Sequence, residues 1–191
     1  MRYCKIDKEG QIKLEGDPRL LYAVMLGMRV WIVCSVWRFT AYASIIAGRY
    51  AVTRRQFNTT PEGSRHKERK LLDYQAHQQK LIGALAQSIT FNLAQNYLGN
   101  YYLEFIQQLY AGSENYKPLK IIHHFSAGLK AYYTNSVHST LTTLRESCGG
   151  TGFHAFSGLP YLCNEHSAYV AFEGDNTVMI QQCAKVIIDK V

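Results

Sequence analysis

The chain has 191 residues, of which 47% are hydrophobic and 18% charged, so it can form one domain with a sizeable core rather than a disordered or low-complexity segment. Its 21 lysines and arginines outnumber its 14 acidic residues, which makes nucleic acid, a membrane surface or a phosphate-bearing cofactor candidate partners. The tightest basic cluster, Arg65 to Lys70, is accompanied by no zinc-finger or RNA-recognition motif. We therefore expect no nucleic acid partner.

The five cysteines include no CxxC pair, which predicts free thiols in a reducing compartment. Cys163 and His166 have the spacing of half a zinc site, but no second half follows at finger spacing, so we predict no metal site. The longest apolar stretch, residues 20–46, contains Arg29 and Arg38, which argues against a transmembrane helix. No targeting signal is recognised at either end.

Weak alternation in the first residues predicts an extended arm or hairpin over residues 1–16. A helix is then predicted to start with Asp17 as N-cap and Pro18 in its first turn. From there to Ile46, apolar residues recur at three- and four-residue steps on more than one face, which is typical of a helix buried within a bundle.

The same periodicity predicts further helices, separated by loops at 58–65 and 111–118. These helices span residues 68–110, 119–148 and 177–188, with a short helical turn between 161 and 169. Short connections favour antiparallel neighbours. We therefore predict an all-α fold, an antiparallel four-helix bundle over residues 17–191.

Two glycine clusters interrupt the helical pattern near the C-terminus, Gly149-Gly150-x-Gly152 and Ser157-Gly158-x-Pro160. The first can bring the backbone close to a phosphate or ring, or can simply end a helix. Glu173 then lies on a glycine hinge before the last apolar run, where Asp175 or Asn176 can cap the helix. An acid placed there can face a substrate or merely stabilise the helix N-terminus.

The segments CGGTGF, SGLP and FEGDNTV resemble the C-terminal helical domain of the acyl-CoA oxidases, the peroxisomal branch of the acyl-CoA dehydrogenase superfamily. The resemblance continues upstream through GDPRLLYAVMLGMR, RYAVTRRQF and LLDYQAHQQKL, so it covers nearly the whole chain. Acids at Glu146 and Asp175 favour the oxidase branch, because the dehydrogenase branch usually has glutamine and a small hydroxyl residue there.

The resemblance implies an enzyme that places a double bond between Cα and Cβ of a fatty acyl-CoA, with FAD as redox cofactor and O2 reduced to hydrogen peroxide. One carboxylate must remove the α-proton, and Glu173 stands at the position of this base. A carboxylate with a pKa of about 4 is a weak base, so we expect partial burial of a catalytic one. Arg29 matches the family's arginine near that carboxylate, although the residues alone also allow a side chain that reaches the surface.

The resemblance also implies a set of FAD contacts. The candidate cofactor-binding residues are Arg54, Gln56, Phe57, Gln75, Gly149, Gly150, Asp175 and Asn176. The first three match a segment that reaches the flavin of a neighbouring subunit, where the planar fork of an arginine suits a pyrophosphate. Gln75 matches a glutamine that contacts adenine across the interface, and the two glycines match the backbone near the adenosine. Asp175 and Asn176 match positions beside the flavin and its ribityl chain.

Two hypotheses follow. The chain is either the FAD-contacting domain of an acyl-CoA oxidase-type enzyme of fatty acid β-oxidation, inactive alone because the family's other domains are missing, or a non-catalytic structural subunit of a larger assembly. Both predict association with a second copy or with chains that supply the missing domains. The resemblance implies a peroxisomal location, with a mitochondrial one as the alternative.

Overall fold

The computed structural model describes residues 4–14, 19–58 and 68–188, and most of the regular structure in these ranges is helical. The α-helices are α1 (Arg19–Ser35), α2 (Trp37–Thr53), α3 (Gln75–Tyr110), α4 (Lys117–Ser147), α5 (Leu159–Ser167) and α6 (Asn176–Ile188). The predicted cap at Asp17 and Pro18 lies outside the described residues, as does the loop predicted at 58–65 except for Asn58. The predicted all-α fold is confirmed.

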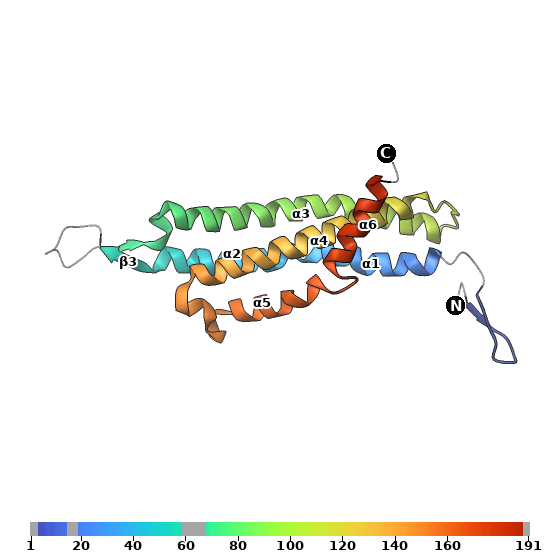
Figure 1. Cartoon of the computed structure of the whole chain (residues 1–191), viewed down its shortest axis with the longest axis horizontal. Helices are drawn as coiled ribbons and strands as arrows, with labels where there is room; N and C mark the ends of the chain where they lie inside the picture. Colours follow the sequence, from blue (N-terminus) through green and yellow to red (C-terminus); the bar gives the residue numbers. More distant parts are fainter. Residues whose placement is uncertain (1–3, 15–18, 59–67, 189–191) are drawn as a thin grey trace.

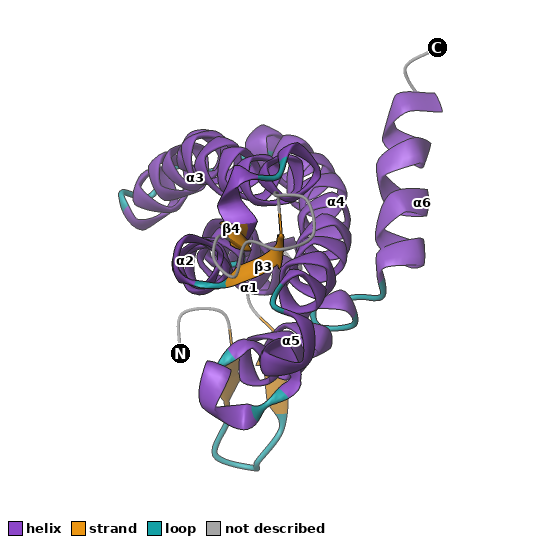
Figure 2. Ribbon diagram, turned by 90° about the vertical axis from the view of Figure 1, so that its left-hand side faces the viewer, coloured by secondary structure: helices purple, strands orange, loops and turns teal. Residues whose placement is uncertain are grey.

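Three antiparallel rods form the body of the molecule (Figure 1). Helices α1 and α2 follow one another nearly end to end as one rod, and α3 and α4 run beside it in alternating directions. Viewed along the rods, α6 stands outside α4, and α5 lies below α2 and α4 (Figure 2). The predicted count of four bundle members is not confirmed, because three rods contact one another while α6 packs mainly on α4.

The core lies between these three rods. Its fully buried apolar side chains come from the first rod, from α4 and from the start of α5; they include Leu26, Val33, Val36, Ala43, Ala47, Ile122, Val137, Leu144 and Leu159. Helix α3 contributes larger rings, of which Phe91 stacks on Tyr133 of α4 with ring centroids 3.8 Å apart. Each fully buried leucine or phenylalanine contributes about 1.5–3 kcal/mol, so this interface holds the rods in register.

The first rod is longer than predicted and has a one-residue break. It continues past Ile46 to Thr53, and a turn at Val36 separates α1 from α2. At the break, the Ser35 hydroxyl donates to the Ile32 carbonyl and the Trp37 indole donates to the Cys34 carbonyl. Val36 itself keeps helical dihedrals, with φ −65° and ψ −25°, so the two helices continue as one rod.

A small hairpin forms the N-terminal arm. Strand β1 (Cys4–Ile6) pairs antiparallel with β2 (Ile12–Leu14), and Lys5 lies opposite Lys13. The Asp7 carboxylate accepts hydrogen bonds from the backbone N–H groups of Glu9 and Gln11, which closes the turn. Within the range 1–16, for which an arm or a hairpin is predicted, the described residues 4–14 form a hairpin.

A second strand pair corrects the predicted helix over 68–110. Residues Glu68–Lys70 form strand β4, which pairs with β3 (Arg55–Asn58), and a 3₁₀ turn, η1 (Leu71–Asp73), precedes α3. Glutamate, arginine and lysine are good helix formers, so local propensity favours the wrong element here. Pairing with β3 overrides it, since structural context routinely outweighs propensity.

The stretch Met25–Thr53 is long and apolar enough to cross a membrane by length and composition alone. In this structure it forms most of the first rod, and 44% of its most apolar window is buried within the bundle. Core helices of bundles pass the same test, so this stretch is weak support for a membrane span.

His166 of α5 is buried against the first rod. The His166 ring packs edge-on against Phe39, with centroids 5.3 Å apart, and stacks with Tyr169 at 5.9 Å. It is fully buried, and no described residue offers a hydrogen-bond partner to either ring nitrogen. Burial, assisted by the nearby His138, lowers the pKa of His166 from 6.5 to about 4.

We predict that His166 makes the fold sensitive to acid. Between about pH 6.5 and 4 the unfolded chain binds a proton that the native state excludes, so stability falls as the pH falls through this range. In His166→Phe, the loss of unfolding free energy between pH 7 and pH 4.5 should be about 2–3 kcal/mol smaller than in the unchanged chain.

Urea titrations at both pH values measure this difference. His154→Phe is the matched control, because the His154 ring is exposed. If His166→Phe and the unchanged chain lose the same stability, this role of His166 is wrong.

Candidate functional site

The candidate catalytic residue lies in a strained turn. A 3₁₀ turn, η4 (Ala168–Val170), follows α5, and residues 171–175 connect it to α6. In this connection Glu173 has a φ of 57° and Gly174 a φ of 111°. A left-handed conformation costs a non-glycine residue about 1–2 kcal/mol, so other contacts must hold Glu173 in it.

Arg29 provides one of these contacts. Its Nε and Nη2 atoms donate to the backbone carbonyl of Glu173, at 3.2 and 3.0 Å. Its third nitrogen, Nη1, lies 3.2 Å from Nδ1 of His123. Arg29 is only 4% exposed, so it does not reach the surface. It pairs with the backbone of Glu173, while no hydrogen bond from a described residue reaches the Glu173 carboxylate.

His123 completes the contacts of Arg29. Burial and then the charge of Arg29 lower the pKa of His123, with a smaller effect from His124. Because an arginine can only donate, His123 accepts this hydrogen bond through Nδ1 and therefore carries its proton on Nε2.

Lys130 lies on α4, a different rod from that of Arg29, and binds the same turn. Its ammonium group donates to the carbonyls of Val170 and Gly174 at 2.9 and 2.6 Å, and to Oδ1 of Asn176 at 2.8 Å. Burial, with a contribution from Arg29, lowers the pKa of Lys130 to about 8. Lys130 is not among the site residues predicted from the sequence. The available signal is a charge on the apolar stripe of α4, between the buried Ala127 and Thr134.

Asp175 and Asn176 begin the last helix in two different ways. Asp175 is exposed and accepts the backbone N–H of Thr177, the hydrogen bond that chiefly lowers its pKa. The Asn176 side chain is buried; its Nδ2 donates to Thr134 at 2.9 Å and to Asn135 at 2.8 Å. A ligand contact from Asn176 would therefore have to come from its main chain.

The other predicted cofactor residues lie at the far end of the bundle, by the β3–β4 pair (Figure 1). Arg54 follows α2, Gln56 and Phe57 lie on β3, and Gln75 is the first residue of α3; all four are exposed. Phe57 has a φ of 66° and packs edge-on against Tyr74, with centroids 6.4 Å apart. The hydroxyl of Tyr74 donates to the Gln56 carbonyl, so the strand pair is held onto the start of α3.

Gly149 and Gly150 lie just beyond the C-terminus of α4, in the 3₁₀ turn η2 (Gly149–Phe153). Both are exposed, and a Cβ atom added to either would meet no atom within 4 Å. Gly152 differs, because a Cβ there would collide with the backbone carbonyl of Arg145. The first two glycines leave open space for a ligand, whereas the third is required by the fold.

The predicted site residues therefore form two groups rather than one. Arg29 and Glu173 lie together at the start of α6, whereas Arg54, Gln56 and Phe57 lie at the end of the first rod. The rod advances about 1.5 Å per residue, so Arg29 and Arg54 are roughly 35 Å apart. The two groups do not share one cleft within this chain.

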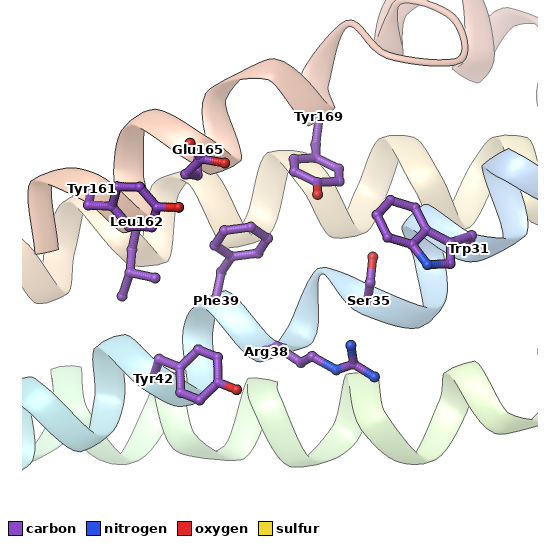
Figure 3. A pocket seen from close by; sticks show the side chains of 9 residues that line it. All are labelled: Trp31, Ser35, Arg38, Phe39, Tyr42, Tyr161, Leu162, Glu165 and Tyr169. Carbon is purple, nitrogen blue, oxygen red and sulfur yellow. The ribbon is translucent and has the colours of Figure 1, made fainter. Parts of the chain in front are cut away.

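An open pocket lies between the first rod and α5, next to the Glu173 turn (Figure 3). Its cavity volume is about 350 Å³, and aromatic rings dominate its lining. The lining residues are Trp31, Ser35, Arg38, Phe39, Tyr42, Tyr161, Leu162, Glu165 and Tyr169. Tyr169 also contacts Phe172, the residue before Glu173, with ring centroids 5.9 Å apart. One lining residue of the pocket is therefore in contact with the turn that carries the candidate base.

No group of three or more metal-ligating side chains occurs in the part of the chain that the structure describes. Four described cysteines, Cys34, Cys148, Cys163 and Cys183, are free thiols. One of them, Cys183 of α6, lies 3.5 Å from Nδ1 of His124 on α4. This contact joins α6 to α4 and lies outside both groups of candidate site residues.

Comparison with known proteins gives a consistent result. Residues 22–188 match the family model described as "Acyl-CoA oxidase, C-alpha1 domain". The chain is 32% identical to peroxisomal acyl-coenzyme A oxidase 2 of Rattus norvegicus, over 98% of this chain and 27% of that protein. It is 29% identical to peroxisomal acyl-coenzyme A oxidase 1 of Dictyostelium discoideum, over 98% and 26%.

Solved structures agree with the sequence matches. An acyl-CoA oxidase from Lycopersicon esculentum (tomato) superposes with a TM-score of 0.86 at 30% identity, over 99% of this chain and 28% of that one. Acyl-CoA oxidase-2 of Caenorhabditis elegans, solved with FAD, ascaroside-CoA and ATP, superposes with a TM-score of 0.87 at 25% identity, over 99% and 28%. The chain thus spans just over a quarter of the length of these relatives.

Backbone geometry predicts opposite outcomes for two glycine substitutions, one in this turn and one in α3. Gly174→Ala should lower the unfolding free energy by about 1–3 kcal/mol, because alanine at this φ is strained. Its Cβ would also press on the Met179 side chain. Gly83→Ala, at an exposed position inside α3 with open space around it, should raise the unfolding free energy by up to about 1 kcal/mol.

Urea denaturation of both variants measures this contrast. Equal stability of Gly174→Ala and the unchanged chain would contradict the strained geometry of the turn.

Proposed function

The chain belongs to the family of acyl-CoA oxidase C-alpha1 domains, and from this premise we propose that it forms the base-bearing, FAD-contacting part of an acyl-CoA oxidase-type enzyme. The reaction is the α,β-dehydrogenation of a fatty acyl-CoA in fatty acid β-oxidation. The activity belongs to the assembly that supplies the remaining domains, because the relatives are about four times longer than this chain.

The observation that carries this proposal is the way Glu173 is held. Its backbone carbonyl is bound by a buried arginine while its carboxylate accepts no hydrogen bond from a described residue. The main chain is therefore held in place and the carboxylate is left to accept the α-proton of a thioester. A residue whose only task was to stabilise the start of α6 would not require a strained backbone and a buried cation.

The aromatic pocket is the proposed location of part of the acyl chain. It is lined by Trp31, Phe39 and Tyr169, among others (Figure 3), and the Tyr169 ring also contacts Phe172, next to Glu173. Apolar rings next to the candidate base would hold the hydrocarbon while the thioester end faces Glu173.

The exposed residues at the β3–β4 end and the open turn that follows α4 each have groups that fit an FAD. Arg54 can neutralise a pyrophosphate, the open main chain at Gly149 and Gly150 can approach a nucleoside closely, and the Phe57 ring, 67% exposed, can pack on a flavin ring. When bound, FAD supplies the hydride acceptor, and O2 takes up the electrons as hydrogen peroxide. Because this group lies far from Glu173 within one chain, we propose that it serves the cofactor of a neighbouring subunit.

Helix α3 offers a surface for such a neighbour. Apolar side chains recur at three- and four-residue steps on one face and are between 49% and 74% exposed: Ile82, Leu85, Ile89, Leu93 and Tyr97. A continuous exposed apolar stripe of this kind typically marks an interface. We propose that a second copy of the chain covers it, as expected for a family whose cofactor site lies between subunits.

The peroxisome is the proposed location, since the curated relatives from Rattus norvegicus and Dictyostelium discoideum are named as peroxisomal. The comparisons favour the flavoenzyme hypothesis over the structural-subunit hypothesis, because both relatives are named as acyl-CoA oxidases. The retained Arg29–Glu173 contact supports the same choice.

Glu173→Gln tests the base. In the FAD-loaded assembly it should lower the rate of flavin reduction by acyl-CoA roughly 1,000-fold, since base catalysis typically contributes about 10²–10⁴-fold. Flavin content and melting temperature should stay near those of the unchanged protein. Rapid-mixing measurement of flavin bleaching gives the rate, and Glu104→Gln, an exposed carboxylate on α3, is the control. Unchanged bleaching in Glu173→Gln would rule out Glu173 as the base.

Leu93→Glu tests the α3 surface. The unchanged chain should self-associate at micromolar concentration in sedimentation velocity, and a charge within the apolar stripe should shift it towards monomer. Ser139→Glu, at an exposed position on α4 and so outside the α3 stripe, should leave association intact. A monomeric unchanged chain would contradict the proposed interface.

A further inference from the structure

Among the residues that the structure describes, Lys130, in the middle of α4, is the largest that is fully buried. An ammonium group has three N–H donors, and all three have an acceptor here: Val170 and Gly174 through their carbonyls and Asn176 through Oδ1. A buried charge that lacks such partners costs several kcal/mol, so the group needs this turn in this conformation.

The acceptors of Lys130 lie on both sides of Glu173. Val170 precedes it by three residues, and Gly174 follows it directly. Arg29 binds the carbonyl between them, that of Glu173 itself. Three carbonyls of one short turn thus face two buried cations from two different rods. With the main chain fixed on both sides, the direction of the Cα–Cβ bond of Glu173 is fixed as well.

Asn176 connects this arrangement to α4 a second time. Its Oδ1 accepts from Lys130 while its Nδ2 donates to the Thr134 hydroxyl, one helical turn after Lys130. The Thr134 hydroxyl itself donates to the Lys130 carbonyl at 2.8 Å. Lys130, Thr134 and Asn176 therefore form a closed hydrogen-bonded group that anchors the first residue of α6 behind Glu173.

We propose that Lys130 is a positioning residue for the Glu173 base: it holds the 170–176 turn so that the carboxylate keeps its direction towards the substrate. This role rests on the proposed function of Glu173. Lys130 itself touches neither substrate nor cofactor, and acts through the main chain.

The test is Lys130→Met in the FAD-loaded assembly that contains this chain. Methionine keeps most of the volume but offers no donor to the three acceptors. The limiting rate constant of flavin reduction at saturating acyl-CoA should fall about 100-fold, as expected when a catalytic group is displaced by about 1 Å. The acyl-CoA concentration that gives half this rate should change less than threefold, since the pocket residues are untouched.

Leu144→Ala is the matched control for lost stability. Leu144 is fully buried on the same helix, near its far end, and belongs to the apolar core. This variant should lower the melting temperature at least as much as Lys130→Met, yet its folded molecules should keep the unchanged rate constant. A purely structural Lys130 predicts instead that both variants lose stability and neither loses rate.

A second readout does not depend on cofactor or substrate. Amide hydrogen exchange at residues 172–177 should become about tenfold faster or more in Lys130→Met, because the turn opens locally, and should stay unchanged in Leu144→Ala. Thr134→Val, which removes only the hydroxyl that binds Asn176, should show the same pattern more weakly. If Lys130→Met does not fold, hydrogen exchange in Thr134→Val tests the positioning role in its place.

The outcomes separate the two proposals. If Glu173→Gln is inactive but Lys130→Met and Thr134→Val keep the rate constant, the positioning role is wrong and the base assignment stands. Unchanged exchange at residues 172–177 also overturns the positioning role. If Glu173→Gln keeps its rate, the base assignment itself fails, whatever Lys130→Met does.

Discussion

The site depends on one arrangement: backbone carbonyls of the turn before α6 face two cations that the bundle buries. Arg29 comes from the first rod and Lys130 from α4, so the turn is held only when these rods are packed together. Burying two cations costs free energy that the apolar core must offset. In return, Glu173 keeps a left-handed conformation that it would not adopt in a free loop. The bundle thus serves as the scaffold for one carboxylate.

The same scaffold separates two functions along its length. The proposed base lies near the start of α6, whereas Arg54, Gln56 and Phe57, proposed FAD contacts, lie around β3 and β4. Three stiff rods keep these regions apart, so one chain cannot bring them to a common ligand. Together with the exposed apolar face of α3, this geometry favours an assembly in which each chain contributes to two sites.

Some parts of the structure could be predicted from the sequence and others could not. Apolar periodicity located the helices, because each long helix buries a continuous stripe. It misassigned Glu68–Lys70, where a strand partner separated by several residues overrides helix propensity. The family resemblance identified Glu173 and Arg29 as neighbours, but not that Arg29 binds a main-chain oxygen. Lys130 was missed, since a single lysine within an apolar stripe looks like any helix lysine that reaches solvent.

The sequence by itself determined the all-helical fold, the position of the glycine-bounded turn and the family to which the chain belongs. These depend on local periodicity, on backbone preferences of glycine and on motif order, all of which can be recognised in a linear string. Only the tertiary structure decided which acceptors each buried cation binds, that Asn176 faces inward, and that the candidate site residues form two separate groups. Those facts depend on distances between residues up to 144 positions apart, which the packing of the rods sets and no local pattern records.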